Sequence, residues 1–252
     1  MSTQADSLRF ERSPKRVRAL VGGQAVFDTR EALLVWEHPY YPTYYVPADD
    51  VHAELVEAAD PSGRTTHAAL GAARVLDVRI GEQLRSGAAL AFPHAADDAL
   101  RRMVRLKWDA MDEWLEEDEP VYVHPRDPYK RIDILASSQH VRVVVDGVTV
   151  ADSRQPRILF ETSLPPRYYL PPPDVRMDLL VPTDSVTRCP YKGDATWWSL
   201  EGDGRRYDDL AWTYRAPTPE SQKIAGLVAF YNERVDLYLD GALQDRPKSP
   251  FA

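Results

Sequence analysis

Apolar and polar residues alternate along two short segments of the chain, at 141–145 and 148–153. Alternation with a period of two places the apolar side chains on one face, which is typical of a half-buried strand. Asp146 and Gly147 separate the two segments, and this dipeptide suits the positive φ angles of a tight hairpin turn. The pattern therefore predicts a β-hairpin, followed by a third strand over 157–161.

The same pattern occurs once more, 124 residues earlier in the chain. At this constant offset, residues 17–51 align with 141–175 without a gap, and 14 of the 35 positions are identical. Unrelated sequences would share about two positions in a segment of this length. Further along, Leu76 and Leu200 still keep the offset. The chain therefore contains a tandem duplication.

The remaining apolar runs of the second copy predict more strands and one short helix. Residues 162–175 are rich in proline, which lacks the amide donor of a regular strand, so we expect this segment to cross one face of the sheet in extended form. The helix is expected over 219–227. The strands are expected over 196–200, 210–214, 227–231 and 235–239, with the last two close to a hairpin.

In the first copy, two patterns overlap between Leu100 and Leu115. Apolar residues recur there at helical spacing, whereas the repeat places a strand over 103–107. We interpret the segment as a short helix before 103, a strand, and a second short helix over 108–116.

These features predict a mainly β protein with two tandem domains and short helices. The segment that connects the domains, residues 116–138, contains prolines and aromatic residues, which favour a docked strap over a flexible tether. The predicted parts are a disordered polar lead-in (1–14), a first, degenerate β domain (15–115), a docked connecting strap (116–138), a second, motif-bearing β domain (139–246) and a tail (247–252).

Composition excludes several classes of protein. The formal net charge of −8 argues against a general nucleic-acid binder, which needs a basic surface. No apolar run approaches the roughly 18 residues of a membrane-spanning helix, so no membrane partner is expected. Cys189 is the only cysteine, so an intramolecular disulfide and a multi-cysteine zinc site are both impossible. We expect no metal site and a reducing cytoplasmic location.

The two copies differ most around Cys189. The second copy reads RCPYKGDATWWSL, and the first has RTTHAALGAARVL at the same offset, with Thr65 opposite Cys189 and Ala68 opposite Lys192. A nearby ammonium favours the thiolate form of a thiol. Cys189, Lys192 and Tyr191 are therefore candidates for a nucleophile, its activating cation and an acid or hydrogen-bond donor.

Aromatic residues are dense in the second copy and predict a pocket that is apolar with polar tips. Arg154 or Lys192 would fix a polar group of a ligand there. Structural alternatives stay open, because aromatic residues are usually core and a single cysteine is often a small buried apolar side chain. Arg154 with Glu161 or Asp174 also fits a structural ion pair. The candidate ligand-binding residues are Arg154, Glu161, Tyr168, Tyr169, Trp197, Trp198, Trp212 and Tyr214.

The ordered motifs of the second copy resemble a known family. VRVVVDGVTVADS, LFETSLPPRYYLPPPDV, CPYKG with WWS, DLAWTY and IAGLVAFYNERVDLYLDG are similar to domain of unknown function 427, in its two-domain bacterial form. The resemblance implies small β domains similar to the β-tent of Mss4-like proteins, many of which bind zinc through paired cysteines that this chain lacks. The family is also labelled nucleotidyltransferase-like, but the chain offers no phosphate-binding glycine loop and no acidic metal pair.

Three functions fit the sequence. In the first, the second domain binds an unknown small organic ligand in its aromatic pocket. In the second, the protein is an enzyme that uses Cys189 as nucleophile or redox centre. In the third, the two domains form a scaffold for a protein partner. No GxxxxGK[ST], GxGxxG, HExxH, CxxC or GxSxG motif is present, so no cofactor is predicted.

Overall fold

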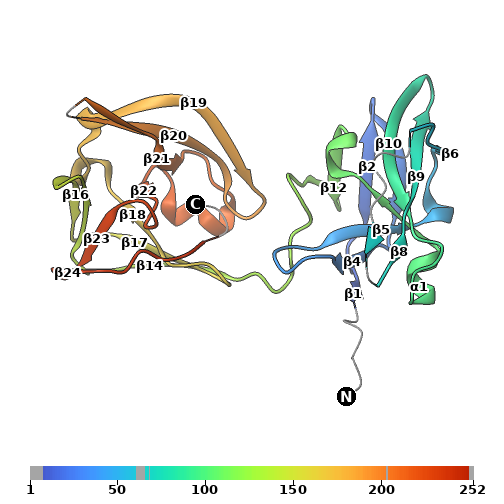
Figure 1. Cartoon of the computed structure of the whole chain (residues 1–252), viewed down its shortest axis with the longest axis horizontal. Coiled ribbons are helices and arrows are strands. Elements are labelled where there is room, and N and C mark those ends of the chain that lie inside the picture. Colours follow the sequence, from blue (N-terminus) through green and yellow to red (C-terminus); the bar gives the residue numbers. More distant parts are fainter. Residues whose placement is uncertain (1–7, 61–65, 68, 203, 250–252) are drawn as a thin grey trace, which may run out of the picture. The chain divides into compact units, whose positions relative to one another are not determined.

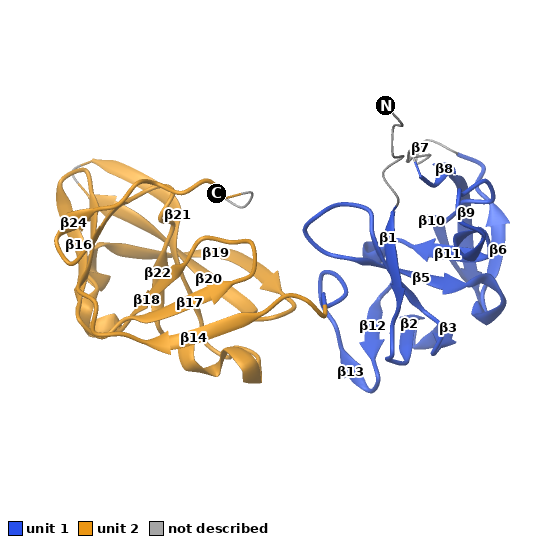
Figure 2. Cartoon of the chain, turned by 90° about the horizontal axis from the view of Figure 1, so that it is seen from below, with its two compact units in different colours: residues 1–127 blue, residues 128–252 orange. Residues whose placement is uncertain are grey.

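The computed structural model describes residues 8–60, 66–67, 69–202 and 204–249. The chain forms two compact units, residues 1–127 and 128–252, which we describe separately (Figure 2). Both units consist mainly of strands, which confirms the predicted mainly β fold in two tandem copies.

The second domain contains a seven-stranded and a four-stranded antiparallel sheet (Figure 1). In order of hydrogen-bonded neighbours, the larger sheet is β14 (Ile132–Ala136), β17 (Arg157–Glu161), β18 (Arg167–Leu170), β22 (Val228–Phe230), β21 (Arg205–Tyr214), β20 (Gly193–Gly202) and β19 (Leu180–Cys189). The smaller sheet is β16 (Val148–Ser153), β15 (Val141–Val145), β23 (Asp236–Leu239) and β24 (Ala242–Leu243).

The first domain repeats this strand order in both sheets. Its larger sheet is β1 (Arg9–Arg12), β4 (Leu33–Trp36), β5 (Thr43–Pro47), β11 (Met103–Leu106), β10 (Gln83–Ala91), β9 (Arg74–Ile80) and β6 (Glu54–Glu57). Its smaller sheet is β13 (Glu119–Pro120), β12 (Glu113–Glu116), β2 (Val17–Val21) and β3 (Gln24–Thr29), and a separate hairpin joins β7 (Thr66–His67) to β8 (Gly71–Ala72).

The predicted hairpin at the start of the second copy is confirmed. Strands β15 and β16 pair antiparallel, and the turn residues Asp146 and Gly147 have φ angles of 47° and 80°. Positive φ at both central residues matches the right-handed twist of the flanking strands. Gly22 and Gly23 adopt the same turn in the first domain, with φ angles of 57° and 76°.

Each seven-stranded sheet is covered by apolar side chains on both of its faces. In the second domain, one face packs against the smaller sheet, with contacts that join Val143 to strand residues such as Leu210 and Phe230. The opposite face carries a second core, in which Ile224 of the 3₁₀ helix η6 (Pro219–Ile224) packs beside Trp212. Because successive side chains of a strand point to opposite faces of the sheet, one strand supplies residues to both cores.

The proline-rich segment differs from its prediction. Its four central residues form β18, which pairs with β17 on one side and β22 on the other. Prolines flank the strand and none lies within Arg167–Leu170, so every residue of the strand keeps its amide donor. The prediction of an extended crossing segment over 162–175 was therefore wrong for these residues.

Other element predictions are corrected at their ends. The strands predicted at 227–231 and 235–239 do form, but β22 and β23 belong to different sheets and make no hairpin. The second helix predicted over 108–116 is a single turn, η3 (Trp108–Ala110), followed by strand β12, whereas α1 (Asp98–Arg101) agrees with the helix expected before 103. Arg9–Arg12 of the expected lead-in form strand β1, and residues 1–7 lie outside the described part of the chain.

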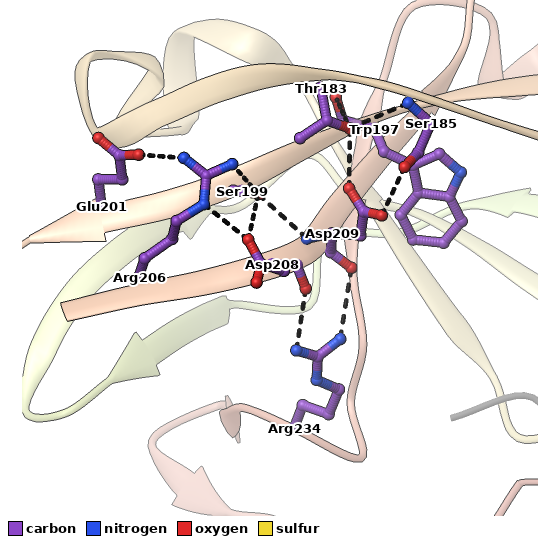
Figure 3. A network of polar contacts seen from close by, with 9 residues as sticks. All are labelled: Thr183, Ser185, Trp197, Ser199, Glu201, Arg206, Asp208, Asp209 and Arg234. Carbon is purple, nitrogen blue, oxygen red and sulfur yellow. Dashed lines mark hydrogen bonds and ion pairs between the residues drawn. The ribbon is translucent and has the colours of Figure 1, made fainter.

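A β-bulge interrupts strands β20 and β21, and a network of polar side chains stabilises it (Figure 3). Asp209 has a positive φ of 45° at the bulge. Its carboxylate accepts hydrogen bonds from Thr183 Oγ1 at 2.8 Å and Ser185 Oγ at 2.7 Å, both on β19. Its amide donates to Ser199 Oγ at 3.2 Å, and Arg234 donates to its carbonyl oxygen at 3.4 Å. The network therefore connects three strands at the bulge.

The first domain builds the equivalent bulge with different residues. Gly87 is the counterpart of Asp209. Gly87 lies two residues before Ala89, which pairs with β11, and Asp209 lies two residues before Ala211, which pairs with the equivalent strand β22. Gly87 has a φ of 57°, and its amide donates to Asp77 Oδ1 at 2.7 Å. In the first domain, Gly87 adopts the positive φ of the bulge without strain. In the second domain, the hydrogen bonds of the Asp209 carboxylate compensate for the unfavourable positive φ of that residue.

We predict that Asp209→Ala lowers the free energy of unfolding of the second domain by about 2 kcal/mol, because two charge-assisted hydrogen bonds are lost while the unfavourable φ remains. Asp209→Gly should cost less, since glycine adopts positive φ freely. Urea denaturation followed by tryptophan fluorescence measures both. Equal stability of Asp209→Ala and the wild type would contradict this role of the carboxylate.

Candidate functional site

The hairpin that carries Cys189 is held in a fixed conformation by segments that follow it in the chain. Cys189 pairs with Gly193, whose φ is 93° and whose added Cβ would lie 3.3 Å from the carbonyl oxygen of Ala216. The carbonyl oxygen of Tyr191 accepts hydrogen bonds from Thr218 Oγ1 at 2.5 Å and from Ser221 Oγ at 3.0 Å. Glycine at 193 and these two hydroxyls therefore fix the turn.

This turn directs the Lys192 ammonium into the domain, where it forms an ion pair with Glu161 at the end of β17. The two side chains are only 12% and 7% exposed. Burial alone would lower the pKa of Lys192, but its interactions with Cys189, Glu161 and Tyr169 outweigh burial and raise the pKa above 10.5. The contribution of the charged ammonium is therefore present at neutral pH, and it is lost as pH rises through the raised pKa.

Two buried tyrosines lie beside this ion pair. Burial raises the pKa of Tyr169 to about 12, and Trp212 Nε1 donates a hydrogen bond to its hydroxyl at 3.3 Å. Burial also raises the pKa of Tyr214 well above 10, with smaller contributions from Tyr169 and Cys189. Cys189 itself is half-buried. The thiol, the ammonium and both phenols thus belong to one electrostatic cluster.

A second ion pair lies on the same face of the sheet among aromatic rings. Arg167 donates to both oxygens of Glu233, at 2.6 and 2.5 Å. Burial would raise the pKa of Glu233, but the hydrogen bonds from Arg167 keep it below its ordinary value. The Arg167 guanidinium lies 5.7 Å from the Trp212 ring and 5.6 Å from the Tyr231 ring.

The aromatic rings of this face contact one another. Trp212 lies 5.2 Å from Trp197 and 4.9 Å from Tyr231, measured between ring centroids, and Trp197 stacks on Tyr231 at 5.5 Å. We call the whole set the aromatic–ionic cluster. Its members are Glu161, Arg167, Tyr169, Cys189, Lys192, Trp197, Trp212, Tyr214, Tyr231 and Glu233.

The structure divides the residues that the sequence singled out. Tyr168 and Trp198 belong to the core on the opposite face of the sheet, because neighbours along a strand point to opposite sides. Arg154 is exposed and forms no ion pair with Glu161 or with Asp174, which accepts a hydrogen bond from a serine instead. These three candidates are therefore removed from the site.

Other predicted residues do come together, and some members were missed. Glu161, Tyr169, Lys192, Trp197, Trp212 and Tyr214 all join the cluster, together with the half-buried Cys189. The carbonyl oxygen of Tyr191 accepts the hydrogen bonds that fix the turn. Arg167, Tyr231 and Glu233 were not predicted. Arg167 and Glu233 are 66 residues apart, so no local pattern links them.

The constant offset of 124 fails at the hairpin. His67 pairs with Gly71 across three residues, as Cys189 pairs with Gly193. Gly71 also has a positive φ, 74°, and its added Cβ would lie 3.5 Å from a backbone carbonyl oxygen. Gly71, not Ala69, is therefore the counterpart of Gly193. Leu70 then corresponds to Lys192. The strand pairing also makes Leu76 the counterpart of Trp198 instead of Leu200.

This corrected register shows that the buried glutamate is paired in both domains, with cations from different elements. Glu37, the counterpart of Glu161, lies 3.1 Å from the Nε atom of Arg105 on β11. The counterpart of Arg105 in the second domain is Ala229. The counterpart of Lys192 in the first domain is Leu70, which is fully buried. The cation has therefore moved between elements while the carboxylate has stayed in place.

The aromatic part of the cluster has no such counterpart. In the first domain the equivalent core contains Val75, Leu90 and Phe92, where the second domain has Trp197, Trp212 and Tyr214. Tyr45 corresponds to Tyr169 and is retained. Most of the aromatic–ionic cluster is thus specific to the second domain.

Within the residues that the structure describes, no three His, Cys, Asp or Glu side chains are grouped so that they could hold a metal ion. No helix in those ranges is long and apolar enough to span a bilayer. The polar groups of the cluster are two matched ion pairs, phenols, indoles and one thiol.

We predict that Lys192→Leu lowers the free energy of unfolding of the second domain by about 3 kcal/mol, because Glu161 is left buried without a cation. Adding Trp212→Leu and Ala229→Arg copies Leu70, Leu90 and Arg105 of the first domain and should restore much of that loss. The matched control is the Lys192→Leu/Trp212→Leu double variant, measured by urea denaturation. A triple variant no more stable than this double variant would show that a cation from β22 cannot serve Glu161.

Comparison with known proteins follows the division into two domains. A family model described as a domain of unknown function (DUF427) matches the chain twice, over residues 9–117 and 133–241. Each match runs from the outermost strand of a seven-stranded sheet to the smaller sheet of the same domain. No curated protein matches the chain. Because the two matches together span most of its length, the chain belongs to the DUF427 family.

Proposed function

We propose that the second domain binds a small organic ligand at the aromatic–ionic cluster. The observation that supports this is the comparison between the two domains. Both fold into the same two sheets, yet Trp197, Trp212 and Tyr214 replace two aliphatic residues and a phenylalanine on one face only. A fold that is stable with Val75 and Leu90 has no structural need of two tryptophans there.

The ion pairs support the same proposal. Replacement of a buried ion pair by apolar residues of similar volume is often neutral or stabilising, so such a pair is weak evidence for a structural role. The second domain contains two of them, Glu161–Lys192 and Arg167–Glu233, and of these the first domain has an equivalent only of the former, Glu37–Arg105. The positions of Arg167 and Lys192 are occupied in the first domain by Thr43 and Leu70.

The chemistry of the cluster indicates the kind of ligand. Indole and phenol rings present flat apolar surfaces, and Arg167 lies over two of them. Charges of opposite sign are already matched, so the cluster favours a planar organic molecule with polar substituents over a highly charged one. Lys192 is paired with Glu161 and also interacts electrostatically with Cys189, so the nucleophile hypothesis stays the alternative.

We predict that planar aromatic acids, nucleosides and related compounds include a ligand that raises the melting temperature of the full chain. The triple variant Trp197→Val/Trp212→Leu/Tyr214→Phe, which copies the first domain, should weaken its binding by about tenfold or more while the domain stays folded. Thermal shift identifies the ligand, and calorimetry measures its Kd.

The matched control is Trp198→Leu, which copies Leu76 and alters the opposite face of the same strand. It should leave ligand affinity unchanged. Ligands whose Kd is the same in the triple variant and the wild type, or changes equally in both variants, would contradict binding at this cluster.

A further inference from the structure

The second domain has an exposed apolar edge. Strand β14 lies at one edge of its larger sheet, and within the described part of the chain β17 is the strand that pairs with it (Figure 2). Leu135 on β14 is 53% exposed, and Phe160 on β17 is 42% exposed. Their neighbours Ile134 and Leu159 belong to the core on the opposite face of the sheet. Leu135 and Phe160 therefore share one face, where the strand register makes them diagonal neighbours.

The first domain carries charged side chains at the equivalent edge. The register of β1 on β4 places Glu11 where β14 has Leu135. Trp36, the counterpart of Phe160, lies under the guanidinium of Arg9, which is 4.0 Å from the centroid of its ring. Charged side chains at a sheet edge protect it against pairing with another chain. The same edge of the second domain exposes apolar side chains instead.

The backbone of β14 is oriented for pairing with a further strand. The carbonyl oxygen of Arg131 accepts a hydrogen bond from the Thr162 amide at 3.0 Å, and its amide donates to Thr162 Oγ1 at 2.9 Å. Because hydrogen-bonding groups alternate in direction along a strand, those of Ile132 and Ile134 point away from β17. The carbonyl oxygen of Ile134 accepts a hydrogen bond from Lys223 at 3.2 Å, so a donor from outside the sheet reaches this edge.

The charges along this edge favour a second copy of the chain as the partner. Arg131 and Asp133 lie two residues apart, are 78% and 42% exposed, and form an ion pair at 2.9 Å. In an antiparallel pair of two β14 strands centred on Ile132, Arg131 of each copy lies opposite Asp133 of the other, so both charges are matched twice. A pair centred on Asp133 would instead place two carboxylates opposite each other. The pairing about Ile132 also brings Arg131 of the copy into the same row of side chains as Phe160.

We propose that β14 is the interface between two copies of this chain, which join their larger sheets by antiparallel pairing centred on Ile132. The outward-facing amide and carbonyl of Ile132 bond to those of the copy, and Lys223 gives up its hydrogen bond to the backbone of the added strand. The adjoining strand covers Leu135 and Phe160. The interface is independent of ligand binding in the second domain, because none of these residues belongs to the aromatic–ionic cluster.

Sedimentation velocity of the full chain over micromolar to millimolar concentrations tests the interface, and we expect a monomer–dimer equilibrium. Leu135→Glu, which copies Glu11 of the first domain, should raise the dissociation constant of the dimer by about tenfold or more. The matched control is Leu243→Glu on β24 of the smaller sheet, since Leu243 is similarly exposed at 58%, and it should leave the constant unchanged. A chain that is monomeric at every concentration would overturn the proposal, as would a dimer that both variants weaken equally or that neither weakens.

Charge reversal tests the register. Arg131→Asp and Asp133→Arg each place like charges opposite each other in a homodimer, so each variant alone should dimerise about tenfold more weakly than the wild type. Mixed in equal amounts, the two variants carry opposite charges at the facing positions and should form a heterodimer. Both side chains are exposed, so the urea midpoint should stay close to that of the wild type, which separates loss of the dimer from loss of the fold. A mixture that stays monomeric, or a single variant that dimerises as tightly as the wild type, would overturn the assignment.

Discussion

A carboxylate buried at the end of one strand, together with the cation that neutralises it, is the constraint on which the candidate site depends. An unpaired charge in a protein interior costs several kcal/mol, so the buried Glu161 carboxylate needs a cation beside it. The tight turn at Gly193 brings Lys192 to it, and the hydroxyls of Thr218 and Ser221 hold that turn. The position of the thiol follows from the same turn, because Cys189 is its first residue.

The two domains form an internal comparison in which the fold is constant and one core differs. What they share is the architecture, the buried glutamate and its tyrosine neighbour, Tyr45 or Tyr169, and we assign these to the scaffold. What differs is the source of the cation and the size and polarity of the surrounding side chains. These differences are the basis of the ligand proposed for the second domain.

Much of the fold could be predicted from sequence, because hairpins are local and duplication repeats them. The turn at Asp146 and Gly147 needs positive φ, and the sequence shows it directly. The site was harder to predict, since its contacts join distant strands. Nothing local links Arg167 to Glu233, and alternation along β20 sends Trp197 and Trp198 to opposite faces, which a count of aromatic residues does not reveal. The longer connection before the hairpin in the first domain also shifted the alignment there, and only strand pairing corrects such a shift.

The most direct test of charge matching at the buried carboxylate is a double-mutant cycle with Glu161→Gln and Lys192→Met. The free energy of unfolding of the second domain is measured for the wild type, both single variants and the double variant. The account predicts that each single variant loses about 3 kcal/mol and that the double variant loses much less than the sum, because no unpaired charge remains. Small losses in the single variants, or losses that simply add, would show that water solvates the two charges and that the pair does not organise the site.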